Sequence, residues 1–114
     1  MIDFACKKFD IEEVIKCSLA LSKSDFRILK FLMQNDDSFS TEELSKKLDL
    51  DKSTIQRSVK KLHSQGLITR GQINQTIGGY LFLYRIKEKE RIRKIILDIV
   101  EGWTENVRRG IKSW

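Results

Sequence analysis

Apolar residues recur at steps of three and four over most of the chain, which is the spacing of amphipathic helices. The longest stripe lies at the C-terminal end, where it continues for about 25 residues, or nearly 40 Å of helix. Four shorter runs precede it. The pattern therefore predicts five helices, over residues 10–21, 22–34, 41–48, 52–65 and 88–114.

Residues that cap helices stand at the expected boundaries. Two capping boxes are present, Ser22 with Asp25 and Ser40 with Glu43. Asp51 is well placed to cap the helix over 52–65. Gly66 follows that helix and predicts a left-handed stop, with Leu67 packing back on Leu62.

After Gly66 the apolar period changes from helical to extended. Residues 67–70 look like the start of a strand, and residues 80–86 are strongly strand-like. The polar stretch 72–79 between them predicts a loop, so that the two strands form a β-hairpin. Residues 38–40 could supply a short third strand. Together these elements predict an α+β fold that is mostly α.

The length of 114 residues corresponds to one domain, and we expect a single domain over 1–114. No apolar run approaches the roughly 18 residues of a membrane span. The N-terminus does not read as a secretory signal, so we expect a cytoplasmic protein. There is no room for both a catalytic cleft and a substrate domain, which argues against an enzyme.

The residues that most often bind metals or carry out nucleophilic chemistry are scarce. His63 is the one histidine and reads as a surface residue near a helix end. Cys6 and Cys17 are too few for a disulfide scaffold and are interpreted as buried or merely reduced thiols rather than a redox pair. Two chains together could assemble four cysteines, which leaves a metal or redox role open. We expect no cofactor and no metal site.

The net charge of +6 is concentrated in one part of the chain. Residues 44–85 hold eight basic and two acidic side chains, whereas the remainder holds fourteen of each. A local positive field of this kind attracts a polyanion such as nucleic acid. A lysine-rich face that only keeps the protein in solution is the alternative.

The predicted order of elements is that of a winged helix-turn-helix. The stretches 41–48 and 51–62, followed by Gly66-Leu67-Ile68 and Gly78-Gly79-Tyr80, resemble transcription regulators of the MarR and TrmB-like kind. Small archaeal TrmB-like regulators without a sugar-binding domain are the nearest likeness. The resemblance implies a DNA-binding regulator with a winged helix-turn-helix over 22–86, between an N-terminal helix (10–21) and a dimerisation helix (88–114).

The helix over 52–65 has the two faces that a recognition helix needs. Ile55, Val59 and Leu62 form its apolar back. Gln56 can pair with adenine and Arg57 with guanine. The lysines one turn further on are better placed for phosphate. The predicted DNA-binding residues of this helix are Lys52, Ser53, Thr54, Gln56, Arg57, Lys60 and Lys61.

The predicted wing over 70–79 has a polar tip and one cation. Such a tip suits contact with the DNA backbone or the minor groove, although a plain hairpin loop would look alike. With one cation the wing contributes modestly. Its candidate contacts are Arg70, Gln72, Asn74 and Gln75.

The long C-terminal stripe predicts a homodimer, because a small domain cannot cover that length of apolar helix. A core helix folded onto its own domain is the alternative. The predicted interface residues are Ile92, Ile95, Ile96, Ile99, Trp103, Val107 and Ile111.

For the whole protein the leading function is a sequence-specific DNA-binding regulator with double-stranded DNA as partner. A winged-helix protein-interaction module that does not read DNA is the second. A small-molecule effector is left open.

Overall fold

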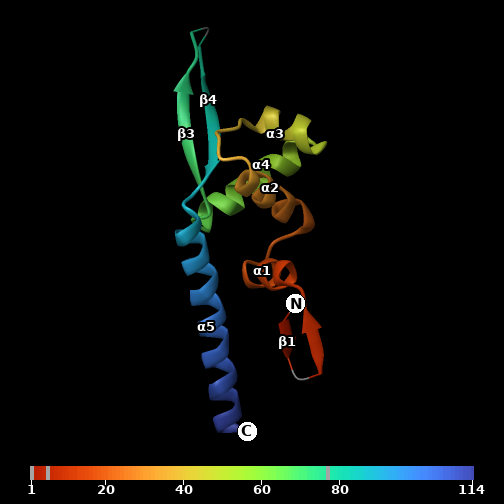
Figure 1. Ribbon diagram of the computed structural model, residues 1–114. Helices are drawn as coiled ribbons and strands as arrows, with labels where there is room; N and C mark the ends of the chain where they lie inside the picture. The colour runs from red at the N-terminus through yellow and green to blue at the C-terminus, as the bar shows by residue number, and fades with distance from the viewer. Residues whose placement is uncertain (1, 5, 77) are drawn as a thin grey trace.

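The computed structural model describes residues 2–4, 6–76 and 78–114. Figure 1 shows an elongated molecule with the hairpin of β3 and β4 at one end and the C-terminal half of α5 at the other. The principal extents are 63 × 24 × 23 Å. In chain order the elements are β1 (Ile2–Phe4), β2 (Lys7–Phe9), α1 (Ile11–Ser18), α2 (Lys23–Gln34), α3 (Thr41–Leu48), α4 (Lys52–Ser64), β3 (Ile68–Asn74), β4 (Tyr80–Ile86) and α5 (Lys89–Ser113).

The five predicted helices are all present, and side-chain caps mark the start of α1, α2 and α3. In both predicted capping boxes the serine hydroxyl accepts the backbone N–H three residues on, and the acidic side chain accepts the serine N–H. Helix α1 is shorter than the predicted 10–21. It ends because Ala20 takes a left-handed conformation (φ 53°), which lets the Leu21 N–H donate to the Lys16 carbonyl at 2.9 Å.

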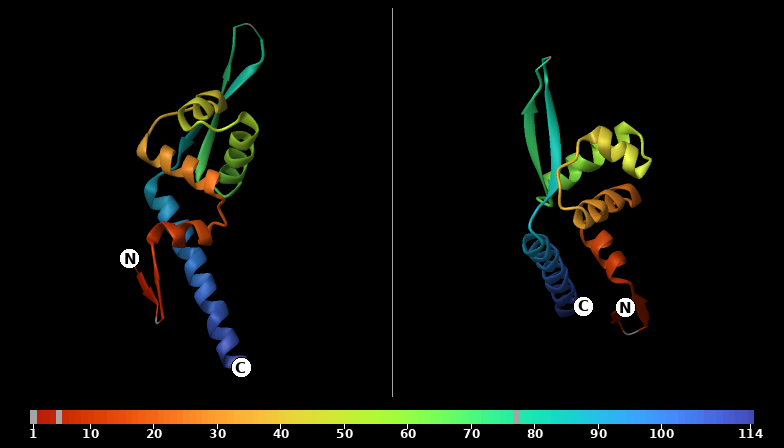
Figure 2. Two further views of the ribbon diagram at one scale, coloured as in Figure 1. Left: turned by 90° about the vertical axis from the view of Figure 1, so that its right-hand side faces the viewer. Right: turned by 45° about the horizontal axis from the view of Figure 1, so that its top comes forward.

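A short hairpin of β1 and β2 precedes the helices and was not predicted. The strands pair antiparallel, with Ile2 opposite Phe9 and Phe4 opposite Lys7. Three residues per strand are too few for a period of two to stand out in the sequence. The hairpin lies below α1, at the side of the core from which α5 extends (Figure 2).

The wing strands are longer than predicted. The predicted loop over 72–79 is wrong for residues 72–74, which continue β3 as far as Asn74, opposite Tyr80. The strand-forming aromatic residues of β4 supply partners for this polar segment, so pairing overrides its low β propensity. Gly78 and Gly79 take positive φ and make the turn; Ile77 lies outside the described residues. In place of a third strand over 38–40 there is one bridge, Phe39 to Tyr84.

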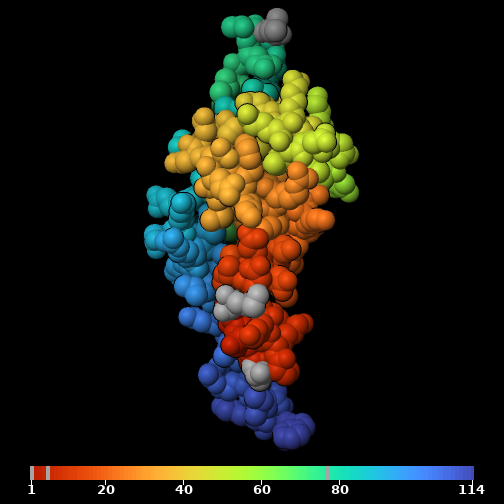
Figure 3. All heavy atoms as spheres, turned by 45° about the vertical axis from the view of Figure 1, so that its right-hand side comes forward, coloured from red at the N-terminus to blue at the C-terminus, as the bar shows by residue number. Residues whose placement is uncertain are grey.

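The core lies where α2, α3, α4 and the base of the wing meet, and the first turns of α5 close it. The predicted apolar back of α4 is buried at its centre. The space-filling view shows the helices around this core as a compact middle section, with the N-terminal segment below it and the end of α5 at the bottom (Figure 3). The core side chains are Leu19, Ile28, Leu29, Leu32, Phe39, Leu44, Ile55, Val59, Leu62, Leu67, Ile68, Tyr84 and Ile92.

Helix α4 ends in a Schellman motif at Gly66, as predicted. The Leu67 N–H donates to the Leu62 carbonyl at 3.1 Å and the Gly66 N–H to the His63 carbonyl at 3.0 Å. Gly66 has a φ of +78°, where a Cβ would meet Ile95 at an ordinary 3.7 Å. Any penalty for a side chain at this position is therefore conformational rather than steric.

We expect Gly66→Ala to lower the free energy of unfolding by about 1–2 kcal/mol, the penalty for a left-handed L-residue. Gly71→Ala is the matched control, because Gly71 lies in a strand with open space around its Cα. Urea denaturation of the two variants measures the difference. Equal stabilities would show that the helix end tolerates another conformation.

Candidate nucleic-acid interface

Helix α4 presents a free polar front to solvent. Its buried side carries Ile55, Val59 and Leu62, which fixes the rotation of the helix about its axis. Among the described residues no acidic side chain lies within ion-pair distance of the cations on its front. The exposed, unpaired front consists of Lys52, Gln56, Arg57 and Lys60.

The two hydroxyls in the first turn of α4 are occupied. Ser53 Oγ donates to the Asp51 carboxylate at 2.8 Å and Thr54 Oγ1 donates to it at 2.5 Å. These bonds, with that of Thr54 the larger, lower the pKa of Asp51 below its ordinary value. Asp51 therefore stands at the predicted N-cap but binds hydroxyls instead of a backbone N–H. In the free protein Ser53 and Thr54 have no spare donor for DNA.

Lys61 is turned back onto its own domain. Its Nζ lies 3.2 Å from Oδ2 of Asp25 and donates to the Ala20 carbonyl. The Asp25 side chain, 8% exposed, also accepts from the Ser58 hydroxyl at 2.5 Å and the Ser22 N–H at 3.0 Å. The predicted phosphate contact of Lys61 does not fit this geometry, because the ammonium is committed to a buried carboxylate.

Burial by itself raises the pKa of Asp25, but the bonds from Ser58, the Ser22 N–H and Lys61 outweigh it and the net pKa is lowered. A lowered pKa means that the folded state binds protons less readily than the unfolded state. The stabilisation by Asp25 is therefore complete at neutral pH and is lost as the pH falls through the acidic range.

We expect Asp25→Asn to lower stability at neutral pH by roughly 1–3 kcal/mol, because a charged hydrogen-bond acceptor is lost. The variant should also lose part of the acid sensitivity of the wild type. Urea denaturation of both proteins at neutral and acidic pH checks this. A constant gap between them at every pH would contradict the lowered pKa.

The wing is poor in charge. Its segment 71–84 contains no charged residue, and the predicted contacts Gln72, Asn74 and Gln75 are all exposed. The Arg70 guanidinium lies 4.5 Å from the centre of the Phe82 ring, which holds the cation at the wing base. The wing can therefore offer amide groups at its tip and one oriented cation.

The structure reduces the basic segment to a smaller set of free cations. Three of its eight basic residues face carboxylates: Lys46 faces Glu42, Lys61 faces Asp25 and Arg85 faces Asp36. The other five, which have no ion pair among the described residues, are Lys47, Lys52, Arg57, Lys60 and Arg70.

Lys47 is a further cation on this surface that was not among the predicted contacts. Its helical neighbour four residues earlier, Glu43, bonds the Ser40 N–H at 3.2 Å in the capping box. Glu43 is thereby held at the start of α3, and Lys47 at its end is left exposed without an ion pair among the described residues. The capping box in the sequence was the signal that could have identified Lys47.

The predicted dimer stripe divides into two parts. Ile92 is 2% exposed and belongs to the core of its own domain, so its assignment to a dimer interface is wrong. Ile95 and Ile96 are half-buried against the same core. Past this point the stripe is open: Ile99 is 38%, Trp103 58%, Val107 41% and Ile111 66% exposed.

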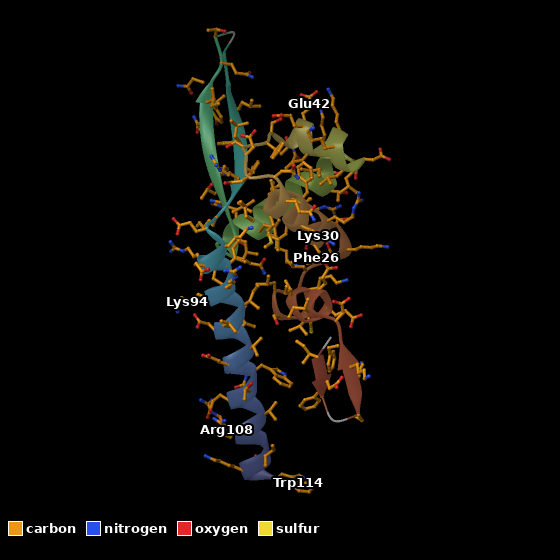
Figure 4. All side chains as sticks on the ribbon, in the orientation of Figure 1. Phe26, Lys30, Glu42, Lys94, Arg108 and Trp114 are labelled. Carbon is orange, nitrogen blue, oxygen red and sulfur yellow. The ribbon has the colours of Figure 1, made fainter. Side chains whose placement is uncertain are left out.

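Helix α5 is clearly amphipathic beyond the core. In Figure 4, Lys94 and Arg108 lie on the side of α5 that faces away from α1, and Trp114 lies towards the side of the N-terminal hairpin. The charged face carries ion pairs within the helix, such as Lys94 with Asp98 at 3.0 Å and Arg108 with Glu105 at 2.9 Å. One side of the helix is thus satisfied in water, and the opposite side is apolar.

Other kinds of site find little support in the part of the chain that the structure describes. Within residues 2–4, 6–76 and 78–114, no group of three His, Cys, Asp or Glu side chains could hold a metal. Cys6 and Cys17 are exposed free thiols, and His63 is exposed. None of the described helices is long and apolar enough to cross a membrane.

Comparison with known proteins agrees with this geometry. A model of the MarR family matches residues 21–74. A solved structure described as a "possible transcriptional regulator" of Methanosarcina mazei is 47% identical, with a TM-score of 0.95; the match covers 100% of this chain and 96% of that one. A protein of Sulfolobus tokodaii shares the fold at a TM-score of 0.71 and 24% identity, over 84% of this chain and 93% of its own. An uncharacterised protein of Methanocaldococcus jannaschii is 28% identical over 92% of this chain and 86% of its own length.

Proposed function

Since the chain belongs to the MarR family of winged-helix transcriptional regulators, which are not enzymes, we propose that it binds specific DNA sequences as a homodimer. The observation that carries this proposal is the exposed front of α4. There Lys52, Lys60 and the amide of Gln56 lie around Arg57, and none of the three cations has an ion pair among the described residues. A protein-interaction module would more often carry apolar residues at Ser53, Gln56 and Arg57.

In the proposed complex α4 enters the major groove. The N-terminal half of a recognition helix faces base edges, which brings Gln56 and Arg57 to the bases. Gln56 can bind adenine and Arg57 guanine, each through two hydrogen bonds. Lys52 and Lys60 flank them and contact phosphates, which sets the register without reading sequence. Ser53 and Thr54 contribute only if the DNA displaces Asp51 from their hydroxyls.

The wing is proposed to lie on the DNA backbone or in the minor groove. Arg70 would contact a phosphate from the wing base, and the amides of Gln72, Asn74 and Gln75 would contact sugars or base edges. With a single cation the wing adds little to the salt dependence of binding.

The dimer is proposed to form through the exposed part of α5. MarR-family regulators bind DNA and typically dimerise. In this chain the open stripe from Ile99 to Ile111 supplies a long apolar surface, and a two-fold axis would make that surface its own complement. Two recognition helices could then read half-sites about one turn, 34 Å, apart.

Fluorescence anisotropy with labelled genomic fragments and a random-sequence duplex tests the proposal. We expect tight binding to a subset of fragments and binding to the random duplex weaker by a factor of about 10³ or more. Equal affinity for every duplex, or none for any, would contradict sequence-specific binding.

Arg57→Ala should cost about 1–3 kcal/mol of specific binding and relax the preference at one base pair. Lys60→Ala should weaken specific and random DNA alike, because a phosphate carries no sequence information. The two variants are matched: both remove one exposed cation from α4. If Arg57→Ala lowers both affinities by the same factor, Arg57 does not read a base.

A further inference from the structure

The N-terminal hairpin has one apolar face. Because strand residues alternate between faces and paired residues share a face, Ile2, Phe4 and Phe9 lie together with Lys7. Asp3 and Lys8 lie on the other face. The apolar face is largely uncovered, since Phe4 is 61% and Ile2 45% exposed. Two strands of three residues are marginal in water by themselves, so this hairpin requires a partner surface to be stable.

An apolar groove of 440 Å³ opens beside α1, the helix that follows this hairpin in the chain. It is formed by α1, α2 and the first turns of α5, and its apolar lining includes Ile11, Ile15, Phe26, Met33 and Ile96. Ile11 at its edge is 52% exposed. From Ile96 the groove continues directly into the open stripe of α5, so that the groove and the stripe form one surface.

The hairpin and α5 lie on two sides of this surface without covering each other. In Figure 1 and Figure 2 the hairpin lies below α1 on the same side of the core as the free part of α5, and the left view of Figure 2 shows the two elements apart. Phe4 on the hairpin and Trp103 on α5 each expose more than half of their surface, at 61% and 58%. Within one chain, neither element therefore covers the exposed apolar side chains of the other.

We propose that the hairpin is an arm that holds the α5 helix of a second copy of this chain against α1 and the stripe. The partner's helix would fill the groove and cover the apolar face of the hairpin, and by symmetry each chain would hold the other. This inference rests on the proposed homodimer and adds to it an interface element outside the long helix, the strands β1 and β2.

A second copy fits this surface in size and in shape. The exposed apolar side chains of the hairpin, the groove and the stripe present on the order of 800 Å² per chain, which is what one partner of a standard interface buries. An apolar helix as long as the open stripe of α5 would cover the stripe. The only described helix of this chain that exposes such a stripe is α5 itself.

The arm would also be connected to the recognition helix. The end of α1 is bonded to α4 by two side chains: Gln65 donates to the Leu19 carbonyl at 2.6 Å, and Lys61 donates to the Ala20 carbonyl. A partner helix seated on α1 would thus be linked to the position of α4. We therefore expect a variant with a defective arm to have a lower affinity for specific DNA as well as a weaker dimer.

Sedimentation equilibrium of Phe4→Ser and Lys8→Ser tests the arm, with the two substitutions on opposite faces of the hairpin. Phe4→Ser should raise the dimer Kd at least about tenfold, and Lys8→Ser should leave it near the wild-type value. Equal Kd values for wild type and Phe4→Ser would overturn the arm while leaving the α5 dimer in place. A monomeric wild type would overturn both.

Hydrogen exchange on the unmodified protein gives a second test that needs no variant. The backbone amides of residues 2–4 and 6–9 should be protected above the dimer Kd and exchange freely below it. The amides of α2 should be equally protected at both concentrations, because this helix belongs to the core of one chain. Protection of residues 2–4 and 6–9 that does not change with concentration would contradict the arm.

Discussion

Trp103→Asp is expected to produce a folded monomer that has lost its specific DNA affinity, although every residue of α4 is unchanged. The Trp103 side chain is 58% exposed in one chain and lies in the middle of the open stripe of α5. A buried aromatic anchor contributes at least about 2 kcal/mol to an interface, and a two-fold axis uses it twice. An aspartate at the same position would also have to bury an unpaired charge.

Sedimentation and circular dichroism would separate loss of the dimer from loss of the fold. Lys94→Asp is the control, because Lys94 lies on the face of α5 that is turned away from α1 (Figure 4). The control should stay dimeric. Specific DNA affinity of Trp103→Asp should fall by about 10³-fold, towards that of a single half-site. A dimeric Trp103→Asp would show that chain pairing does not use the stripe.

Binding to DNA should weaken steeply with salt, by about 10³–10⁵-fold between 50 and 200 mM if a dimer contacts six to ten phosphates. In each chain the basic segment 44–85 contributes five cations that have no ion pair among the described residues, which is consistent with that number of contacts by a dimer. Anisotropy titrations at several salt concentrations give the slope. Binding that does not change with salt would contradict contacts to phosphate through these cations.

Single charge removals locate the contacts. Lys47→Ala should lower the salt slope by about one for each phosphate that Lys47 neutralises in the wild-type complex. Lys94→Ala removes a cation from α5 whose ion-pair partner is Asp98, and it should leave the slope unchanged. The same reduction in both variants would show that the slope reflects total charge and not a defined surface.

Much of the fold could be predicted because its signals are local. The capping boxes at Ser22 and Ser40 and the glycine stop at Gly66 involve residues within five positions of one another, and each forms as expected. The apolar back of α4 follows from helical spacing alone. These local signals together predicted the winged helix-turn-helix order.

Three of the departures from the predictions involve contacts between residues that are not neighbours in the sequence. Nothing near Lys61 indicates that its ammonium would pair with Asp25, 36 positions earlier. Ile92 continues the stripe without a break, yet the core of its own domain buries it. Residues 72–74 read as loop because their strand partners, 80–82, lie beyond the turn. In each case tertiary contacts outweighed the local pattern.

Selection of bound duplexes from a random-sequence pool tests sequence-specific DNA binding by this protein most directly. Two copies of α4 related by a two-fold axis should enrich an inverted repeat, with half-site centres about 34 Å or a multiple of that apart. A guanine within each half-site should lose its preference when the selection is repeated with Arg57→Ala. A retained pool without any common sequence would contradict a sequence-reading role for α4.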